Sequence, residues 1–237
     1  MATVLFDIDG TLIHTAGAGH RAFADTFRTL FGIEKISSDV RFAGRSDRAI
    51  AEELMATHGV ASSSENWLRF VKAFVPRLEE VLPQCQGTVL PGVVELLDRL
   101  KESEQTAIGL LTGNIAAGAQ AKLSHYRLWD RFAFGGYGDD WVNRNDIAAA
   151  ALAASRTYVA QSQDARSGKT NGESQRVIVI GDTPADVECA RSIGAVAVAV
   201  LTGGVPREVL VATEPDLLLD DLSEIDDILV QINSVTA

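Results

Sequence analysis

The segment DIDGTL at residues 7–12 places two carboxylates, those of Asp7 and Asp9, one residue apart on a turn opened by Gly10. Carboxylate oxygens are the ligands that a hard cation such as Mg²⁺ prefers. One carboxylate of such a pair can also attack a substrate as a nucleophile while the other transfers protons. The alternative is an acidic turn without chemistry, because Asp-Gly is common in turns. The other polar clusters of the chain decide between these interpretations.

A second polar cluster, Thr112-Gly113-Asn114, follows the apolar run TAIGLLT at residues 106–112 and precedes a helical pattern that begins near Ile115. A hydroxyl group and backbone N–H groups at the start of a helix form an anion-binding site. An ordinary helix N-cap by Thr112 or Asn114 is the alternative. The cluster is therefore a candidate for binding phosphate.

A third cluster, GDTPAD at residues 181–186, closes the apolar run RVIVIG. Asp182 lies at the predicted strand end and Asp186 one helical turn further along, so both carboxylates can reach the same cation. Asp182 or Thr183 can also cap the helix that starts at Pro184, and such a cap does not exclude metal binding. We interpret the two aspartates as candidate metal ligands.

Apolar runs that end at these clusters predict the strands of a parallel sheet. Most of the runs are rich in β-branched residues, and all are apolar almost throughout, as in strands that are covered on both faces. Helical patterns separate them, which predicts right-handed crossovers and a doubly wound, Rossmann-like α/β core. The predicted strands are residues 3–8, 106–112, 176–181, 195–200 and 216–219, and the predicted helices of the core include residues 93–100, 147–159 and 184–193.

Residues 17–86 interrupt this alternation with three amphipathic helical patterns. No apolar run of comparable strength to the predicted strands lies between them. We therefore predict an all-helical domain at residues 17–86, inserted into an α/β core that comprises residues 1–16 and 87–237. Glycine and proline at 17–19 and 83–92 are typical of hinges at the two junctions.

The polar segment at residues 161–175 contains glycine and lacks any apolar period. Such a segment buries too little apolar surface to pack on a core. We therefore predict a flexible surface loop after the helix at 147–159.

The charge of the chain restricts its partners. Among 237 residues, 32 are acidic and 21 are basic, which gives a formal net charge of −11. Nucleic acid and anionic membranes bind basic surfaces, so neither is an expected partner. A phosphate site must therefore carry its own local positive charge, and a metal ion is suited to supply it. The chain opens with no signal-peptide pattern and contains no apolar stretch near the ~18 residues of a membrane span, which predicts a soluble cytoplasmic protein.

The three clusters together resemble the motifs of the haloacid dehalogenase (HAD) superfamily: DIDGTL at 7–12, LLTGN at 110–114 and GDTPAD at 181–186. They occur in the family's order at predicted strand ends, and the resemblance covers nearly the whole chain. It implies the α/β core with an inserted helical cap and a Mg²⁺-dependent phosphatase. Relatives that displace halide lack the second aspartate of the first motif, so Asp9 favours phosphate chemistry.

The resemblance also implies a role for each carboxylate. Asp7 is implied as the nucleophile that becomes an aspartyl-phosphate and as a metal ligand. Asp9 is implied as the general acid that protonates the leaving alcohol and then as the base that activates water, with its backbone carbonyl on the metal. Asp182 is implied as a metal ligand, and Asp186 as an outer ligand or as a residue that orients its neighbours.

The same resemblance implies a phosphate cradle made of the Thr112 hydroxyl and the N–H groups of Gly113 and Asn114. Phosphoryl transfer passes through a transition state whose charge is spread over the phosphate oxygens. Positioning and electrostatic stabilisation therefore supply most of the catalysis, which agrees with such a cradle beside a metal ion.

One position departs from the family's pattern, because the usual lysine before the last motif is absent. Arg144 lies at the matching place, ahead of the helix at 147–159. Arginine keeps the positive charge and adds a planar fork that suits phosphate, so we interpret Arg144 as the catalytic cation. A solvated arginine at the helix start is the alternative. Lys122, within a helical pattern, and Lys169, within the polar segment, are weaker substitutes.

The position of the helical insert resembles the caps of phosphoglycolate-phosphatase-like and β-phosphoglucomutase-like members. Such caps close over the site and contact the part of the substrate beyond phosphate. Arg45 lies between two helical patterns and is the candidate to contact a substrate carboxylate or hydroxyl. The alternative is that Ser46 or Asp47 caps a helix and Arg45 is solvated. The expected partner is a small phosphorylated metabolite, for which phosphoglycolate is the family-level example. The sequence does not indicate an oligomeric state.

Two alternative functions share parts of this site. A phosphomutase of the β-phosphoglucomutase type uses the same core and phospho-aspartate, but nothing in the cap sequence indicates sugar recognition, so we favour a hydrolase. A non-catalytic signalling module that is phosphorylated on aspartate is smaller, and it lacks both the helical insert and the Asp-x-Asp order. A nucleotide-binding protein is disfavoured because no Gly-x-Gly-x-x-Gly follows the first predicted strand.

Overall fold

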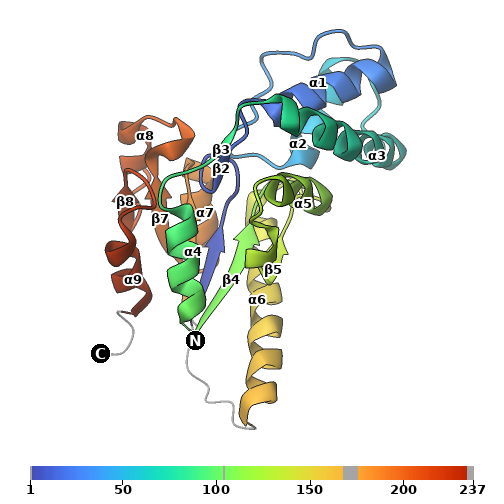
Figure 1. Ribbon diagram of the computed structural model, residues 1–237. Coiled ribbons are helices and arrows are strands. Elements are labelled where there is room, and N and C mark those ends of the chain that lie inside the picture. The colour runs from blue at the N-terminus through green and yellow to red at the C-terminus, as the bar shows by residue number, and fades with distance from the viewer. Residues whose placement is uncertain (1, 104, 168–175, 234–237) are drawn as a thin grey trace.

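A six-stranded sheet forms the centre of the computed structural model, which describes residues 2–103, 105–167 and 176–233 (Figure 1). The strand order is β5-β4-β1-β6-β7-β8, and every neighbouring pair is parallel. This order confirms the predicted doubly wound α/β core. The strands are β1 (Ala2–Phe6), β4 (Thr106–Leu111), β5 (Phe134–Gly136), β6 (Val177–Gly181), β7 (Val196–Val200) and β8 (Leu217–Leu219).

Helices cover both faces of this sheet, as the near-continuous apolar strands require. Alternate residues of each central strand belong to two different hydrophobic clusters. One cluster joins the sheet to α4, α5 and α9, and the other joins it to α6, α7 and α8. These helices are α4 (Val93–Glu102), α5 (Ala116–His125), α6 (Arg144–Ser167), α7 (Pro184–Ser192), α8 (Arg207–Val211) and α9 (Ile225–Asn233).

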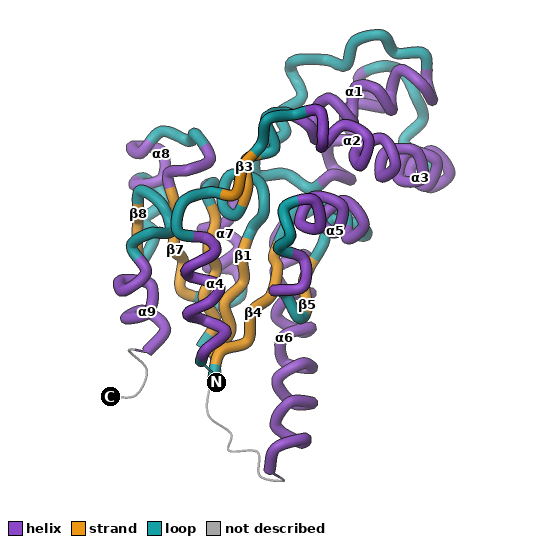
Figure 2. Tube along the Cα trace, in the orientation of Figure 1, coloured by secondary structure: helices purple, strands orange, loops and turns teal. Residues whose placement is uncertain are grey.

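The helix α6 corrects the predicted loop in part. It begins at Arg144 and ends at Ser167, so the prediction of a loop was wrong for residues 161–167. The later turns of α6 extend beyond the sheet (Figure 2). A helix shows an apolar period only where one of its faces is buried, so these turns gave no helical pattern in the sequence. Residues 168–175, with the remainder of the predicted loop, lie outside the described part of the chain.

The inserted segment forms the three predicted helices, α1 (Ala18–Phe31), α2 (Asp47–Thr57) and α3 (Ser64–Val81). They share a hydrophobic cluster of their own, with an aromatic group at its centre. The ring centroids of Phe23 and Phe74 lie 4.7 Å apart, and those of Phe70 and Phe74 lie 5.3 Å apart. We call this helical region the cap, and Figure 1 shows it above the carboxyl ends of the central strands.

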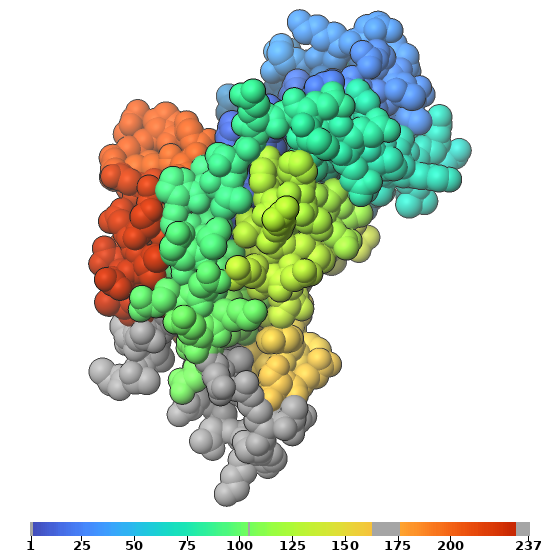
Figure 3. Space-filling view, viewed as in Figure 1, coloured from blue at the N-terminus to red at the C-terminus, as the bar shows by residue number. Residues whose placement is uncertain are grey.

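Two chain crossings connect the cap to the sheet. They pair with each other as the short antiparallel strands β2 (Ile13–His14) and β3 (Thr88–Val89). Gly17 precedes α1 with a left-handed backbone, φ 83°, which a residue with a side chain rarely adopts. In the space-filling view α3 also lies against α5 of the core (Figure 3). No helix in the described ranges is long and apolar enough to span a bilayer.

Candidate active site

The three sequence clusters converge because their strands are neighbours. β1 lies between β4 and β6, and all three run parallel, so their carboxyl ends meet at one edge of the sheet. Asp7 follows β1, Thr112 follows β4 and Asp182 follows β6. The sheet order therefore gathers residues that are at least 70 positions apart in sequence.

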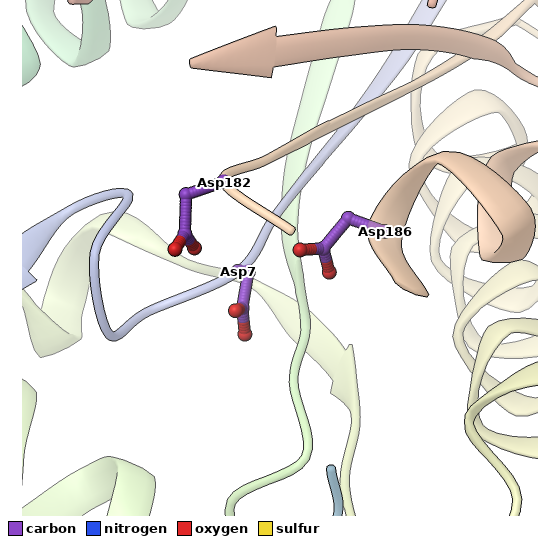
Figure 4. A group of neighbouring side chains, drawn as sticks. All are labelled: Asp7, Asp182 and Asp186. Atoms are coloured by element: carbon purple, nitrogen blue, oxygen red, sulfur yellow. The ribbon is translucent and has the colours of Figure 1, made fainter. Parts of the chain in front are cut away.

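Asp7, Asp182 and Asp186 form a buried acidic cluster, and Figure 4 shows the Asp182 and Asp186 side chains pointing toward Asp7. One oxygen from each side chain lies within 4.8 Å of the other two, and the exposed fractions of the residues are 6%, 4% and 2%. Burial raises the pKa of Asp7 to about 7, an effect that Arg144 opposes and that Asp186 and Asp9 reinforce. Burial, followed by Asp186 and Asp7, also raises the pKa of Asp182 well above its ordinary value.

These features fit a divalent cation at the acidic cluster. Three buried carboxylates repel one another and lose the hydration that would stabilise their charges. All the donors in this site are oxygens, which are the ligands that Mg²⁺ prefers. A cation would also neutralise the negative charges that burial makes unfavourable. The residues present therefore suit the cofactor that the sequence motifs imply.

Two local features hold Asp182 in this cluster. The Thr11 hydroxyl donates a hydrogen bond to Asp182 Oδ1 at 3.1 Å. Gly10 has a left-handed backbone, φ 82°, and a Cβ at this position would lie 2.5 Å from Asp182 Oδ2. A side chain at Gly10 would therefore displace the carboxylate, which explains the glycine between the second aspartate and Thr11.

Asp186 is held by the start of its own helix. Asp186 Oδ2 accepts hydrogen bonds from the backbone N–H of Thr183 at 3.0 Å and from its hydroxyl at 2.6 Å, which completes a capping box. Pro184 occupies the first turn, as predicted. The other oxygen, Oδ1, pairs with Arg144. Both oxygens of Asp186 are thus engaged within the site.

Arg144, the first residue of α6, lies inside the acidic cluster with an exposed fraction of 8%. Its Nη2 pairs with Asp186 and lies 3.7 Å from Asp7 Oδ1. The guanidinium is therefore not the solvated helix-start arginine that the sequence left as an alternative. It is a buried cation beside the predicted nucleophile.

Lys122, expected from the sequence to be a weaker substitute for Arg144, also lies in the site. Its Nζ donates to Asp9 Oδ2 at 2.6 Å and to Asn114 Oδ1 at 2.6 Å, and its side chain is only 6% exposed. Its neighbours Ala121 and Leu123 are also buried. A lysine within a short apolar stretch of a helix was therefore the signal in the sequence that Lys122 is buried. Lys169 lies outside the described residues.

The predicted phosphate cradle is compact and already internally bonded. The buried Thr112 hydroxyl accepts from the Asn114 side-chain amide at 2.8 Å and from the Asn114 backbone N–H at 3.3 Å. The same Asn114 amide donates to Asp9 Oδ2 at 2.9 Å. Asn114 therefore connects the predicted phosphate site to the predicted general acid.

The cap docks on this cradle through the segment that precedes and begins α2. The Asp47 backbone N–H donates to the Gly113 carbonyl at 2.7 Å, and the Asp47 carboxylate accepts from the Ile115 backbone N–H at 2.9 Å. Ser46 caps α2 by accepting from the Ala49 N–H at 3.2 Å, as the alternative in the sequence analysis expected. The cap thus closes directly over the loop that carries the cradle.

Arg45, the candidate for a substrate carboxylate, is engaged within the cap. Its guanidinium pairs with Glu53 at 2.5 Å and donates to the carbonyls of Arg41 and Ala49 at 3.3 and 3.4 Å. Its backbone carbonyl lies close to Gly113, because a Cβ on Gly113 would stand 2.1 Å from it. Arg45 therefore contacts the cradle through its backbone while its charge is met by Glu53.

A cavity of about 280 Å³ lies between the cap and the core loops. Its lining includes Asp7, Asp9, Thr112, Lys122 and Arg144 from the core. The side chain of Asp9 is 41% exposed, in contrast to the acidic cluster beneath it. The predicted nucleophile, the predicted general acid and both cations therefore line one cavity.

Comparisons with known proteins agree with this geometry. The chain matches the family described as haloacid dehalogenase-like hydrolase over residues 4–200. It is 30% identical to the protein named "Probable phosphatase IndB" of Dickeya dadantii, over 94% of this chain and 90% of that protein. It is 28% identical to a phosphoglycolate phosphatase of Synechococcus elongatus, over 95% of each chain. The crystal structure of a hydrolase from Pseudomonas syringae superposes with a TM-score of 0.69 at 22% identity, over 98% of this chain and 99% of that one.

The acidic cluster predicts a stabilisation by Mg²⁺ that does not depend on turnover. Magnesium at about 100 times its dissociation constant should stabilise the wild-type fold by about 2.7 kcal/mol, or roughly 5–10 °C in the melting temperature. Asp182→Asn should lose most of this shift, whereas Asp98→Asn, an exposed aspartate paired with Arg131, should keep it. Thermal unfolding with and without Mg²⁺ measures both, and an undiminished shift in Asp182→Asn would place the ion elsewhere.

Proposed function

Because the chain belongs to the haloacid dehalogenase-like hydrolases and is a phosphatase of that family, we propose that it hydrolyses a small-molecule phosphate monoester through an aspartyl-phosphate on Asp7. The observation that carries this proposal is the pairing of two carboxylates with two cations in one cavity. Arg144 lies beside Asp7, and Lys122 holds Asp9. The two aspartates of one motif thus have separate environments suited to separate tasks.

In the first step, Asp7 attacks the phosphorus atom of the substrate. A bond forms between a carboxylate oxygen and phosphorus while the bond from phosphorus to the substrate's alcohol oxygen breaks. Asp9 gives its proton to that leaving oxygen. Arg144 favours the ionised form of Asp7 and offsets negative charge as the phosphate approaches, since its Nη2 lies 3.7 Å from Asp7 Oδ1.

In the second step, water replaces Asp7 on phosphorus. Asp9, now deprotonated, takes a proton from the water as its oxygen attacks. The bond between phosphorus and Asp7 breaks, inorganic phosphate forms, and the Asp7 carboxylate is restored. The partial exposure of Asp9 to the cavity leaves it able to meet both the leaving alcohol and the incoming water.

Magnesium, when bound, supplies positive charge between the Asp7 carboxylate and the phosphate dianion, which would otherwise repel each other. We assign its ligation to Asp7, Asp182 and the Asp9 backbone carbonyl, with Asp186 as an outer ligand that also positions Arg144. Thr112, Gly113 and Asn114 are assigned to the phosphate oxygens. The capping box and the ion pair of Asp186 support its orienting role.

Lys122 is assigned as a positioning residue for Asp9. Its ammonium group is buried, which by itself would lower its pKa, but Asp9 and Asp47 overcome this effect and the pKa is raised. Lys122 therefore stays charged and fixes one oxygen of Asp9, together with Asn114. This leaves the other oxygen of Asp9 to exchange protons with the substrate.

The helical region is assigned as a cap that opens for substrate and closes for chemistry. We take residues 17–86 as the moving unit and residues 1–16 and 87–237 as the core. The paired strands β2 and β3 bring both crossings to one place, as a hinge requires. Closure excludes bulk water from the phospho-aspartate until the alcohol leaves.

The direct test is release of phosphate from 4-nitrophenyl phosphate with Mg²⁺ or with a chelator. The wild-type protein should release phosphate only with Mg²⁺. Asp7→Asn should lower turnover by a factor on the order of 10³ or more with an unchanged fold, because an amide is no nucleophile. Asp98→Asn serves as the matched control. Activity of Asp7→Asn near that of the wild type would contradict the proposal, and bound Mg²⁺ without phosphate release would favour the mutase.

The role of Lys122 predicts a dependence on the leaving group. Lys122→Met should lower kcat/KM for an alkyl phosphate about 10–100-fold, because a basic alkoxide needs the proton of a well-placed Asp9. The loss should be much smaller for 4-nitrophenyl phosphate, whose leaving group needs no proton. Lys72→Met, an exposed lysine of α3, is the control. Equal losses for both esters would instead assign Lys122 to phosphate binding.

A further inference from the structure

The cavity has two chemically different ends. The core end carries three aspartates and two cations, namely Asp7, Asp9, Asp182, Lys122 and Arg144. The cap contributes mainly apolar and aromatic side chains to the lining, namely Phe23, Phe42, Ile50 and Phe74, together with His20. A phosphate held at the core end would therefore project its alcohol portion against the apolar wall of the cap.

The rings of this wall pack on one another and so form a firm surface. The Phe42 ring centroid lies 5.2 Å from that of Phe23 and 4.9 Å from that of His20. Phe23 lies 4.7 Å from Phe74, with which it packs edge to face. Aromatic pairs of this geometry hold their rings in place beyond simple burial. The wall is therefore suited to contact another ring or a compact apolar group.

The charged groups that line the cavity are poorly suited to a second anionic group. Within the described part of the chain, each arginine or lysine of the lining is paired with a carboxylate. Arg45 pairs with Glu53, Lys122 with Asp9, and Arg144 with Asp186 and Asp7. A substrate carboxylate would have to compete with one of these partners.

The cap also adds a negative charge at this position. Asp47 lines the cavity, and its carboxylate accepts the Ile115 N–H. Burial raises the pKa of Asp47 to about 6, with Lys122 and the Ile115 hydrogen bond opposing the shift. A carboxylate of the substrate placed beside Asp47 would therefore meet a like charge instead of a free cation.

The cavity has room for an alcohol portion of about one ring beside the phosphate. A cavity of about 150 Å³ accepts a benzene ring in a protein interior. The 280 Å³ available here therefore holds a phosphate and roughly one ring.

On the premise that the chain is a phosphatase, we propose that its substrate is the phosphate monoester of a compact, uncharged alcohol of about one ring in size. The apolar wall of the cap, with Phe42 in it, selects this alcohol. Phe42 is the specificity-determining residue because it contacts both His20 and Phe23 at the cap end of the cavity. A short acidic ester such as phosphoglycolate fits the volume but not the charges.

The test compares three esters of primary alcohols: benzyl phosphate, ethyl phosphate and 2-phosphoglycolate. Benzyl phosphate should exceed both others in kcat/KM by about 10–100-fold, the value of burying one ring. Phe42→Ala should remove most of this preference, because it should lower kcat/KM for benzyl phosphate much more than for the other two esters. Phe31→Ala, a phenylalanine of α1 outside the cavity lining, is the matched control and should keep the preference.

The outcomes separate this inference from its premise. A preference for phosphoglycolate, or equal rates for benzyl and ethyl phosphate, with all turnover lost in Asp7→Asn, would overturn the inference and leave the phosphatase intact. Unchanged activity in Asp7→Asn would overturn the premise, and the inference with it. If Phe42→Ala fails to fold, inhibition of the wild-type protein decides: benzylphosphonate should inhibit at lower concentration than phosphonoacetate, and the reverse order would overturn the inference.

Discussion

The repulsion among three buried carboxylates is the constraint on which the rest of this structure depends. Asp7, Asp182 and Asp186 bring their oxygens within 4.8 Å of one another at the edge of a parallel sheet. Such a cluster is costly unless positive charge enters it. The fold supplies Arg144 from the first turn of α6, and the oxygen donors leave a site suited to a divalent cation. A phosphate dianion adds further negative charge, so the same countercharges that stabilise the cluster prepare it for the substrate.

The placement of the cations also separates the two aspartates of the first motif. Asp7 is buried beside Arg144, whereas Asp9 faces the cavity and is held by Lys122 and Asn114. The cap then closes over both through hydrogen bonds of Asp47 to the Gly113–Ile115 loop. Asp47 thus connects the cap directly to the loop that carries the predicted phosphate site.

Much of this architecture follows from local sequence signals. The strand runs and the three motifs are readable because a buried parallel strand is apolar almost throughout and its polar residues gather at one end. Lys122 is different, since its interaction with Asp9 depends on where α5 lies relative to the loop after β1, which is a long-range arrangement. The partner of Arg45 could not be predicted from the sequence either. Glu53 lies two helical turns away, and the sequence alone does not show that the two side chains form an ion pair. The short β5, with two glycines, carried no apolar run to predict it.

The central claim is a covalent bond between Asp7 and phosphorus. Its most direct test is a single turnover of 4-nitrophenyl phosphate by Asp9→Asn with Mg²⁺, quenched in acid and mapped by peptide mass spectrometry. The Asp9→Asn variant should form the aspartyl-phosphate, because nitrophenolate leaves without a general acid. It should hydrolyse this intermediate slowly, because an amide at position 9 cannot activate water. The account predicts one phosphoryl group on the peptide that contains Asp7, in an amount matching the nitrophenol released. Nitrophenol and phosphate released together without a phosphorylated peptide, or a phosphoryl group on another residue, would contradict it.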